Sequence, residues 1–266
     1  MRTILTQDKD FFPQKLKDKF FYLKDAGFDG FEIDGKLLLE RFDEVQEAIA
    51  ATGFPVITAC GGYRGWIGDF DETKRKKGLE DLALMLERLA IISGKGIVIP
   101  AAWGMFSLRL PPMIPPRSSQ EDEKVLHDSL RFLNTIAAKN NVSIFIEPLN
   151  RYEDHMINSL ERGSYYIATG GYSNVRLTAD FYHMNIEESN IYESLLQFGS
   201  YIGHIHLADN HRYQPGSGHT DFISGFNALK EIQYKGAYAI ECRVIGEPSE
   251  LAYLESLSYL RRVSQI

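Results

Sequence analysis

Short runs of β-branched and apolar residues alternate along the chain with longer segments in which apolar residues recur every three or four positions. The short runs have the length of buried strands, and the longer segments have the spacing of helices that bury one face. The alternation continues from one end of the sequence to the other, and no change in composition marks a linker. The pattern therefore predicts parallel strands joined by crossover helices, in one domain over residues 1–266.

Eight segments fit the strand pattern, and two segments show helical leucine spacing most clearly. The strand segments are residues 3–7, 29–34, 56–60, 96–101, 143–149, 175–180, 203–208 and 237–242. The leucine-rich segments are residues 79–92 and 125–139, and Ser118 with Glu121 has capping-box spacing before the second of them. Helix ends before the next strand are indicated by glycines, at Gly27, Gly53, Gly94 and Gly236.

The number of units favours a closed barrel. Eight strand–helix units in 266 residues approach the size of a (β/α)8 TIM barrel, which has about 250 residues. A doubly wound open sheet is the alternative, but neither of the usual glycine-rich nucleotide loops follows the first strand. We therefore expect an α/β fold of the TIM-barrel type, with its active site at the carboxyl ends of the strands.

Composition and charge narrow the function classes. The formal net charge of −7 gives no electrostatic footprint for nucleic acid or for an anionic membrane. The longest nearly apolar stretch, residues 96–106, is far shorter than the roughly 20 residues that span a bilayer. Charged residues 8–10 precede any signal-peptide core, and Cys60 and Cys242 have no metal-finger or disulfide spacing. We therefore expect a soluble, cytoplasmic protein.

Four strand ends carry side chains of the kinds that bind metals. They are Glu147, Asp180, His206 and Glu241. Each of these residues alone can be explained without a metal ion, as a strand cap or as the partner of a neighbouring cation. In a closed barrel the four converge, and a shared cation would compensate carboxylates that follow apolar strand residues. An oxygen-rich set with one imidazole suits Mn²⁺, Mg²⁺ or Co²⁺ better than a thiolate-type zinc site.

Other polar and aromatic residues stand close to the same strand ends. His204 and His206 share one face of their strand, so the spacing does not decide between them as ligand. Five further polar residues are candidates for binding a polyhydroxylated substrate, namely Asn150, Glu153, His155, His183 and Arg212. Each of them can also be a solvated loop residue.

The loops after the third and fourth strands contain two tryptophans and a proline-rich stretch. Trp66 and Trp103 have faces that can stack on a sugar ring, although core or subunit packing is the commoner role. The segment 108–117 contains four prolines, which disfavour a helix, so it either walls the site or serves as a connector or interface arm. The glycine-rich segment 214–219 has no P-loop lysine, which indicates a loop-shaping element.

An ordered set of motifs runs through nearly the whole sequence. It comprises Gly-Phe-Asp-Gly-Phe-Glu-Ile at 27–33, Glu-Pro-Leu-Asn-Arg-Tyr-Glu at 147–153, Asp-Phe-Tyr-His-Met-Asn-Ile-Glu-Glu at 180–188, His-Ile-His-Leu-Ala-Asp-Asn-His-Arg at 204–212, Pro-Gly-Ser-Gly-His-Thr-Asp-Phe at 215–222 and Ile-Glu-Cys at 240–242. With these motifs the chain resembles the sugar isomerase and epimerase family of xylose isomerase-like barrels, in particular its D-tagatose 3-epimerase branch. Residues 59–63, 100–106 and 154–158 further resemble the epimerases of that branch that act on keto-glycosides.

The resemblance implies roles for individual residues. It makes Glu147, Asp180, His206 and Glu241 the ligands of one divalent metal ion, usually Mn²⁺, with Mg²⁺ or Co²⁺ as alternatives. It makes Glu147 and Glu241 the catalytic acid–base pair, and it assigns substrate contacts to Glu153, His183 and Arg212. It also implies a homodimer or homotetramer.

The expected activity is metal-dependent epimerisation of a sugar or keto-glycoside. A proton next to the ketone would leave and return through a cis-enediolate, because a cation on the ketone oxygen makes that carbon acidic enough for a carboxylate base. The nearest alternative is an aldose–ketose isomerase such as hydroxypyruvate isomerase, which uses the same intermediate. An endonuclease IV-like nuclease is disfavoured by the negative charge and the few histidines, and a non-catalytic sugar-binding barrel by the presence of both glutamates. No phosphate loop is evident, which favours unphosphorylated substrates.

Overall fold

Eight parallel strands close into a barrel in the computed structural model, which describes residues 2–108 and 113–265. The strands are β1 (Ile4–Thr6), β2 (Gly30–Asp34), β3 (Val56–Cys60), β4 (Gly96–Pro100), β5 (Ser143–Glu147), β6 (Val175–Asp180), β7 (Ile202–Leu207) and β8 (Tyr238–Ile240). Their order around the barrel follows the chain, and β1 closes it by pairing with β8. The predicted (β/α)8 barrel is confirmed, whereas the single domain over residues 1–266 stays a prediction.

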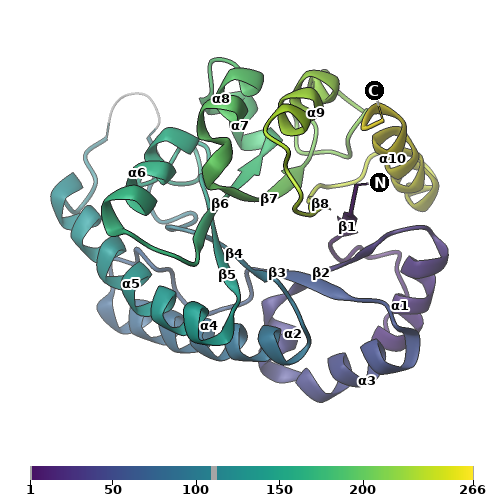
Figure 1. Cartoon of the computed structure of the whole chain (residues 1–266), viewed down its shortest axis with the longest axis horizontal. Helices are drawn as coiled ribbons and strands as arrows, with labels where there is room; N and C mark the ends of the chain where they lie inside the picture. The colour runs from purple at the N-terminus through teal and green to yellow at the C-terminus, as the bar shows by residue number, and fades with distance from the viewer. Residues whose placement is uncertain (1, 109–112, 266) are drawn as a thin grey trace.

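Helices surround the strands on the outside (Figure 1). They are α1 (Leu16–Asp25), α2 (Gly35–Glu40), α3 (Phe42–Thr52), α4 (Glu72–Ile91), α5 (Ser119–Asn140), α6 (Leu160–Gly170), α7 (Phe181–Glu187), α8 (Ile191–Phe198), the 3-10 turn η1 (Gly199–Tyr201), α9 (Phe222–Glu231) and α10 (Ser249–Val263). The short helices α2 and α7 start directly after β2 and β6, so strand ends and helix starts are rigidly joined there.

Seven of the eight predicted strand segments contain an observed strand, and β7 begins at Ile202, one residue before its predicted segment. The helix starts differ more from the predictions. Helix α4 begins at Glu72 rather than at residue 79, because Asp71 caps it by accepting hydrogen bonds from two backbone N–H groups, of Thr73 and Lys74. Its first turns are exposed and charged, so they carry no apolar stripe that the sequence pattern could detect. Helix α5 begins at Ser119 rather than at residue 125, directly after its N-cap Ser118, and the predicted capping box of Ser118 with Glu121 is present.

The glycine-marked helix ends are of two kinds. Gly27 and Gly53 adopt positive φ, of 91° and 63°, in the left-handed region that favours glycine. Before Gly94 and Gly236 the positive φ falls instead on Ser93 and Gln233. At Gly236 glycine is required by a close approach, because an added Cβ would lie 2.2 Å from the Tyr234 hydroxyl.

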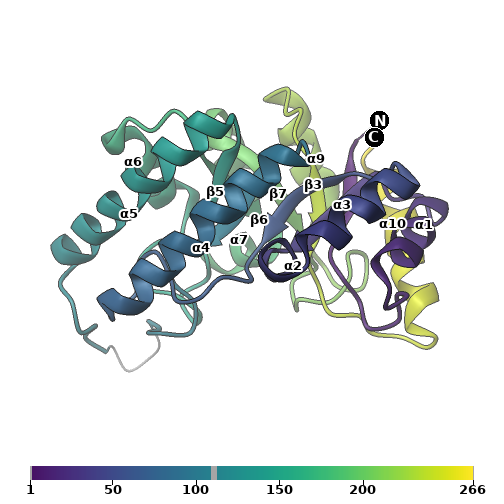
Figure 2. The ribbon, with the colours of Figure 1, turned by 90° about the horizontal axis from the view of Figure 1, so that it is seen from below.

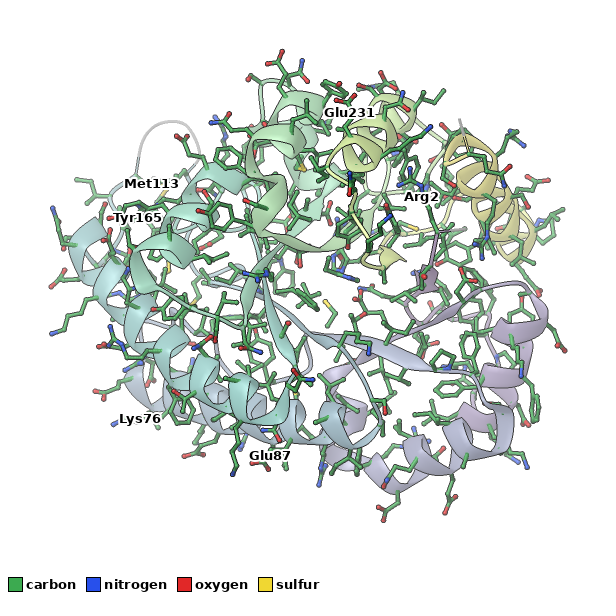
Figure 3. The ribbon with its side chains drawn as sticks, viewed as in Figure 1. Arg2, Lys76, Glu87, Met113, Tyr165 and Glu231 are labelled. Carbon is green, nitrogen blue, oxygen red and sulfur yellow. The ribbon has the colours of Figure 1, made fainter. Side chains whose placement is uncertain are left out.

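The core lies inside the barrel and between the barrel and its helices. The predicted leucine stripes of α4 and α5 are buried, and these two helices pack side by side along the outside of the barrel (Figure 2). Charged side chains point away from this core, as Lys76 and Glu87 on α4 and Glu231 on α9 illustrate in Figure 3. In the part of the chain that the structure describes, no helix combines the length and apolarity needed to cross a membrane.

The glycine-rich segment after β7 is organised by one buried carboxylate. Asp209 accepts backbone hydrogen bonds from Asn210, Gly216, Gly218 and Thr220, at 2.8–3.0 Å. An added Cβ on Gly218 would lie 2.5 Å from Asp209 Oδ1, so this loop closes on the carboxylate only with glycine there. The segment is therefore a loop-shaping element, as predicted. In the proline-rich segment, residues 109–112 lie outside the described residues, and 113–118 contain no helix or strand.

We expect Asp209→Ala to lower the free energy of unfolding by about 3 kcal/mol, because four backbone donors lose their acceptor. Burial opposes ionisation of Asp209, but the backbone N–H groups outweigh it and hold its pKa below the ordinary value. The extra stability is therefore complete above the ordinary carboxyl pKa of about 3.9 and is lost as the pH falls through the lower folded-state pKa.

Urea unfolding of Asp209→Ala and wild type, at neutral and at acidic pH, checks this expectation. Asp221→Ala is the matched control, since Asp221 accepts one hydrogen bond from Ser224 N at the start of α9 and its loss should cost about 1 kcal/mol. Equal losses in the two variants, or an Asp209 effect that does not depend on pH, would contradict the expected role.

Candidate metal centre

The four side chains predicted to converge do so at the carboxyl ends of β5 to β8. Glu147 ends β5, Asp180 ends β6, His206 lies next to last in β7 and Glu241 directly follows β8. The parallel register pairs Asp180 with His206, and Glu241 N donates to Leu207 O at 3.2 Å. One ligand atom from each of the four residues lies within 4.8 Å of the others, and we call this set the four-residue cluster.

His206 stands at the centre of the four-residue cluster. Its Nδ1 lies 2.7 Å from Glu147 Oε1, 2.7 Å from Glu241 Oε2 and 3.8 Å from Asp180 Oδ2. The side chains of His206 and Asp180 are fully buried, that of Glu147 nearly so, and only Glu241 retains 21% exposure. The four-residue cluster is thus inside the barrel, with Glu241 as the side chain most open to a ligand.

Asp180 divides its two oxygens between the fold and the four-residue cluster. Oδ1 accepts the backbone N–H groups of Tyr182 and His183 at 2.7 and 3.2 Å and so caps α7. Oδ2 faces the cluster and accepts a hydrogen bond from Arg212 Nη1 at 2.5 Å. The second Nη group of Arg212 donates to Glu241 Oε2 at 2.6 Å, and its guanidinium stacks on the Tyr182 ring.

The pKa values of the side chains in the four-residue cluster are shifted in different directions. Burial raises the pKa of Glu147 above its ordinary value, and the negative charge of Glu241 adds to the effect. Burial also opposes the charge on Glu241, but Arg212 and His206 outweigh it and hold the pKa of Glu241 well below the ordinary range. The pKa of His206 lies well above its ordinary value, because Glu32, Glu241 and Glu147 outweigh the cost of burying its charge.

The donor set of the cluster fits a hard to borderline divalent cation. Three carboxylates and one imidazole nitrogen converge, and no cysteine belongs to the set. Buried carboxylates this close repel one another unless cationic charge compensates them. Oxygen ligands with one imidazole suit Mn²⁺, Mg²⁺ or Co²⁺. The cluster is therefore a possible site for such an ion.

The three predicted substrate contacts adjoin the cluster through a chain of hydrogen bonds. His183 Nδ1 accepts from the backbone N–H of Asn150 at 3.0 Å, and the Asn150 side-chain amide donates to Glu153 Oε1 at 2.8 Å. Glu153 Oε2 in turn accepts from Trp103 Nε1 at 3.0 Å. With Arg212 on Asp180 and Glu241, the seven predicted site residues form one connected region.

The remaining candidates divide between the rim of the site and the scaffold. Trp103 is 56% exposed and lies edge to face with Trp66 at 6.2 Å, whereas Trp66 itself is partly buried against the core. His155 turns away, since its Nε2 contacts Asp122 Oδ2 at 3.1 Å and its ring packs against Phe70 and Phe106. His155 is therefore held among scaffold residues, and its substrate contact stays a prediction.

Glu32 on β2 is a site residue that the sequence analysis missed. It is 0% exposed, and its Oε2 and Oε1 lie 2.8 Å from His204 Nε2 and 2.9 Å from His206 Nε2. Glu32, His204 and His206 form a second group of potential ligands that shares His206 with the four-residue cluster. An acid between two apolar residues of a buried strand, Phe31 and Ile33, is the sequence signal that indicates it.

A cavity of about 380 Å³ opens beside Glu241 at the carboxyl ends of β1, β2 and β3. Its lining residues are Gln7, Asp8, Glu32, Ile33, Asp34, Cys60, Gly61, Gly62 and Glu241. This size suits a small molecule, since such sites have about 300–1,000 Å³. A cavity of about 450 Å³ lies around Arg2 and Lys235, near the amino ends of β1 and β8, and includes none of the four-residue cluster.

The barrel and the cluster together define a class of protein. The chain belongs to the xylose isomerase-like TIM barrel family, whose model matches residues 20–263.

Particular relatives narrow the class. The 3-dehydro-D-guloside 4-epimerase of Escherichia coli (strain K12) is 52% identical over 256 residues, which cover 96% of this chain and 98% of that protein. The L-ribulose 3-epimerase of Methylomonas sp. (strain DH-1) is 30% identical over 223 residues, 83% of this chain and 73% of that protein. The apo crystal structure of a 3-keto-D-glucoside 4-epimerase from E. coli matches with a TM-score of 0.96 and 51% identity, over 98% of this chain and 100% of that one. These relatives are epimerases, so the predicted enzyme class, isomerase, is confirmed.

The Tyr63 hydroxyl is buried and has no hydrogen-bond partner among the described residues. Removing it in Tyr63→Phe should raise the free energy of unfolding of the ligand-free protein by about 1 kcal/mol, because a buried unsatisfied hydroxyl is lost. Tyr253→Phe is the matched control, since the buried Tyr253 hydroxyl bonds Thr6 Oγ1 at 2.7 Å and its removal should be destabilising. Chemical denaturation measures both, and a loss of stability in Tyr63→Phe would show that its hydroxyl is satisfied.

Proposed function

We propose that the chain is a metal-dependent epimerase of unphosphorylated sugars, acting next to the ketone of a 3-keto-glycoside. The observation that carries the proposal is the pair Glu147 and Glu241, which share one buried cluster with Asp180 and His206. The 52% identity to a protein named 3-dehydro-D-guloside 4-epimerase, across almost the whole of both chains, supports this substrate class.

Glu147, Asp180, His206 and Glu241 hold one divalent cation in this proposal, with Mn²⁺ the first candidate and Mg²⁺ or Co²⁺ the alternatives. When bound, the cation supplies charge that stabilises the ketone oxygen as a proton leaves the neighbouring carbon. His206 contributes its Nδ1, which already faces the three carboxylates.

Glu147 and Glu241 act as the acid–base pair. They come from β5 and β8, with β6 and β7 between them, so a substrate lying over the cluster has one carboxylate on each flank. One glutamate takes the proton from the carbon, and the other returns a proton to the opposite face, which inverts that carbon. An aldose–ketose isomerase needs a base on one face only, so the presence of two carboxylates supports epimerisation.

Glu153, His183 and Arg212 orient the substrate. His183 Nδ1 accepts a backbone hydrogen bond, so the neutral ring carries its proton on Nε2, from which it donates to a sugar oxygen. Glu153 offers carboxylate oxygens to sugar hydroxyls, with its side chain held by Asn150 and Trp103. Arg212 supplies positive charge at the edge of the cluster and is positioned by Asp180, Glu241 and the Tyr182 ring.

Proton NMR in D₂O tests the proposal directly. Mg²⁺-loaded protein is incubated with a panel of 3-keto-glycosides and ketohexoses, and the carbon-bound proton that exchanges is identified. We expect exchange and inversion at the carbon next to the ketone, with rates at least about 100-fold lower in Glu147→Gln and Glu241→Gln and after chelation of the metal, since general acid–base catalysis contributes about 10²–10⁴-fold.

Glu188→Gln is the matched control, because the Glu188 carboxylate accepts hydrogen bonds from Leu160 N and Ser194 Oγ and contacts none of the cluster. It should retain wild-type exchange. Transfer of the proton between the first two carbons would instead identify an aldose–ketose isomerase. Absence of exchange with every sugar, in folded and metal-loaded protein, would overturn the proposed activity.

We further propose that the chain works in the cytoplasm as a homodimer or homotetramer. The two cysteines are unpaired, which supports a reducing compartment. Sedimentation equilibrium of the purified protein checks the oligomeric state, and a mass equal to the single chain of 30.3 kDa at every concentration would contradict it.

A further inference from the structure

Glu32 lies beside the four-residue cluster and contacts it through His206. In residues 2–108 and 113–265, its ion-pair partners are the two histidines of β7, His204 and His206, and each receives one oxygen of the carboxylate. The side chain of Glu32 is 0% exposed inside the barrel, where it borders the cavity that Glu241 also lines. This buried carboxylate, which is costly to desolvate, thus lies beside two imidazole nitrogens, and no lysine or arginine of the described residues forms an ion pair with it.

The Glu32 carboxylate is fixed from two neighbouring elements. Thr58 Oγ1 on β3 donates to Oε2 at 2.7 Å, and Gln7 Nε2, just after β1, donates to Oε1 at 3.0 Å. These two donors hold the plane of the carboxylate, so its oxygens stay directed at the histidines.

His206 needs such a partner because its two ring nitrogens have competing neighbours. A histidine binds a metal ion through a nitrogen without a proton. Nδ1, which faces the cluster, lies 2.7 Å from carboxylate oxygens of Glu147 and Glu241 that can accept its proton. The 2.9 Å contact of Nε2 with Glu32 is off the line of an ideal hydrogen bond, yet its negative charge still favours the proton on Nε2.

We propose that Glu32 is a positioning residue that keeps the proton of His206 on Nε2 and the ring turned so that Nδ1 faces the metal ion. The inference rests on the proposed metal cluster and adds to it. Carboxylates that hold a ligand histidine in this way typically contribute 10–100-fold to metal affinity. His204 takes the other oxygen of Glu32, stacks on Phe145 at 5.4 Å and lies edge to face with His206 at 5.0 Å, so it locks the pair in place.

Mn²⁺ titration followed by electron paramagnetic resonance tests the inference without any substrate. We expect one Mn²⁺ per wild-type chain, a dissociation constant about 10–100-fold higher in Glu32→Gln, and partial rescue in Glu32→Asp, which restores the charge. Thr58→Val leaves Glu32 in place but removes one of its donors, so it should weaken Mn²⁺ binding by a smaller factor. This variant keeps the test valid if Glu32→Gln fails to fold. Glu188→Gln should bind Mn²⁺ as wild type does.

Electron spin echo modulation supplies a readout that a loss of general stability would not move. It detects a nitrogen bound to Mn²⁺, and His206→Gln gives the signal expected without that nitrogen. In Glu32→Gln we expect the nitrogen modulation to weaken or disappear while Mn²⁺ is still bound at saturating concentration. Wild-type modulation and wild-type affinity in Glu32→Gln would overturn the positioning role.

The outcomes separate the inference from the proposed function. A second Mn²⁺ that binds the wild type and is lost in Glu32→Gln would make Glu32 a ligand, in the group with His204 and His206, and would overturn the inference. Failure of the wild type to bind Mn²⁺, Mg²⁺ or Co²⁺ would remove the metal cluster and the inference with it. A weakened Mn²⁺ affinity in Glu32→Gln supports the inference even if no sugar is found to exchange a proton.

Discussion

Carboxylates held inside a barrel away from water are the constraint on which the site depends. Three of them, Glu147, Asp180 and Glu241, surround one imidazole, and such an arrangement is stable only if positive charge enters it. Within the chain, Arg212 and His206 supply that charge. The neighbouring carboxylates raise the pKa of His206, because they stabilise its protonated form. A bound divalent cation meets the need for such charge more fully. The need for positive charge beside the buried carboxylates therefore supports the metal site that we propose.

The residues of the candidate site come from two parts of the fold, the strand ends and the loops that follow the strands. Strand ends hold the cluster, where the hydrogen-bonded ladder of the barrel fixes each backbone position. The loops after β3, β4 and β5 carry Trp66, Trp103 and Glu153, which are joined to one another by ring and hydrogen-bond contacts rather than by a ladder. In the proposed function, the strand ends therefore set the geometry of the metal ligands, and the loops supply the contacts that choose the substrate.

The barrel and the four-residue cluster could be predicted from the sequence because each signal is local. An acid or histidine at the end of an apolar run marks the carboxyl end of a strand, and parallel strands bring those ends together. The sequence analysis missed Glu32 because its place in the site depends on its contacts with His204 and His206, which come from β7 across the barrel. The contact of His155 with Asp122 at the start of α5 could not be predicted for a similar reason, since only the folded chain brings the two side chains together.

Closure of the barrel sets an order on the assembly of the site. Ile4 pairs with Tyr238, and the two ends of the described chain lie side by side in Figures 1 and 2. Glu147, Asp180 and His206 belong to consecutive strands that can associate as soon as β7 is made, whereas Glu241 arrives only with β8. The pairing of the first strand with the last is the most distant strand pairing of the barrel in sequence, so we expect it to form late during synthesis on the ribosome. The carboxylate most open to a ligand therefore comes from the last strand, so the four-residue cluster is complete only when β8 has joined the barrel.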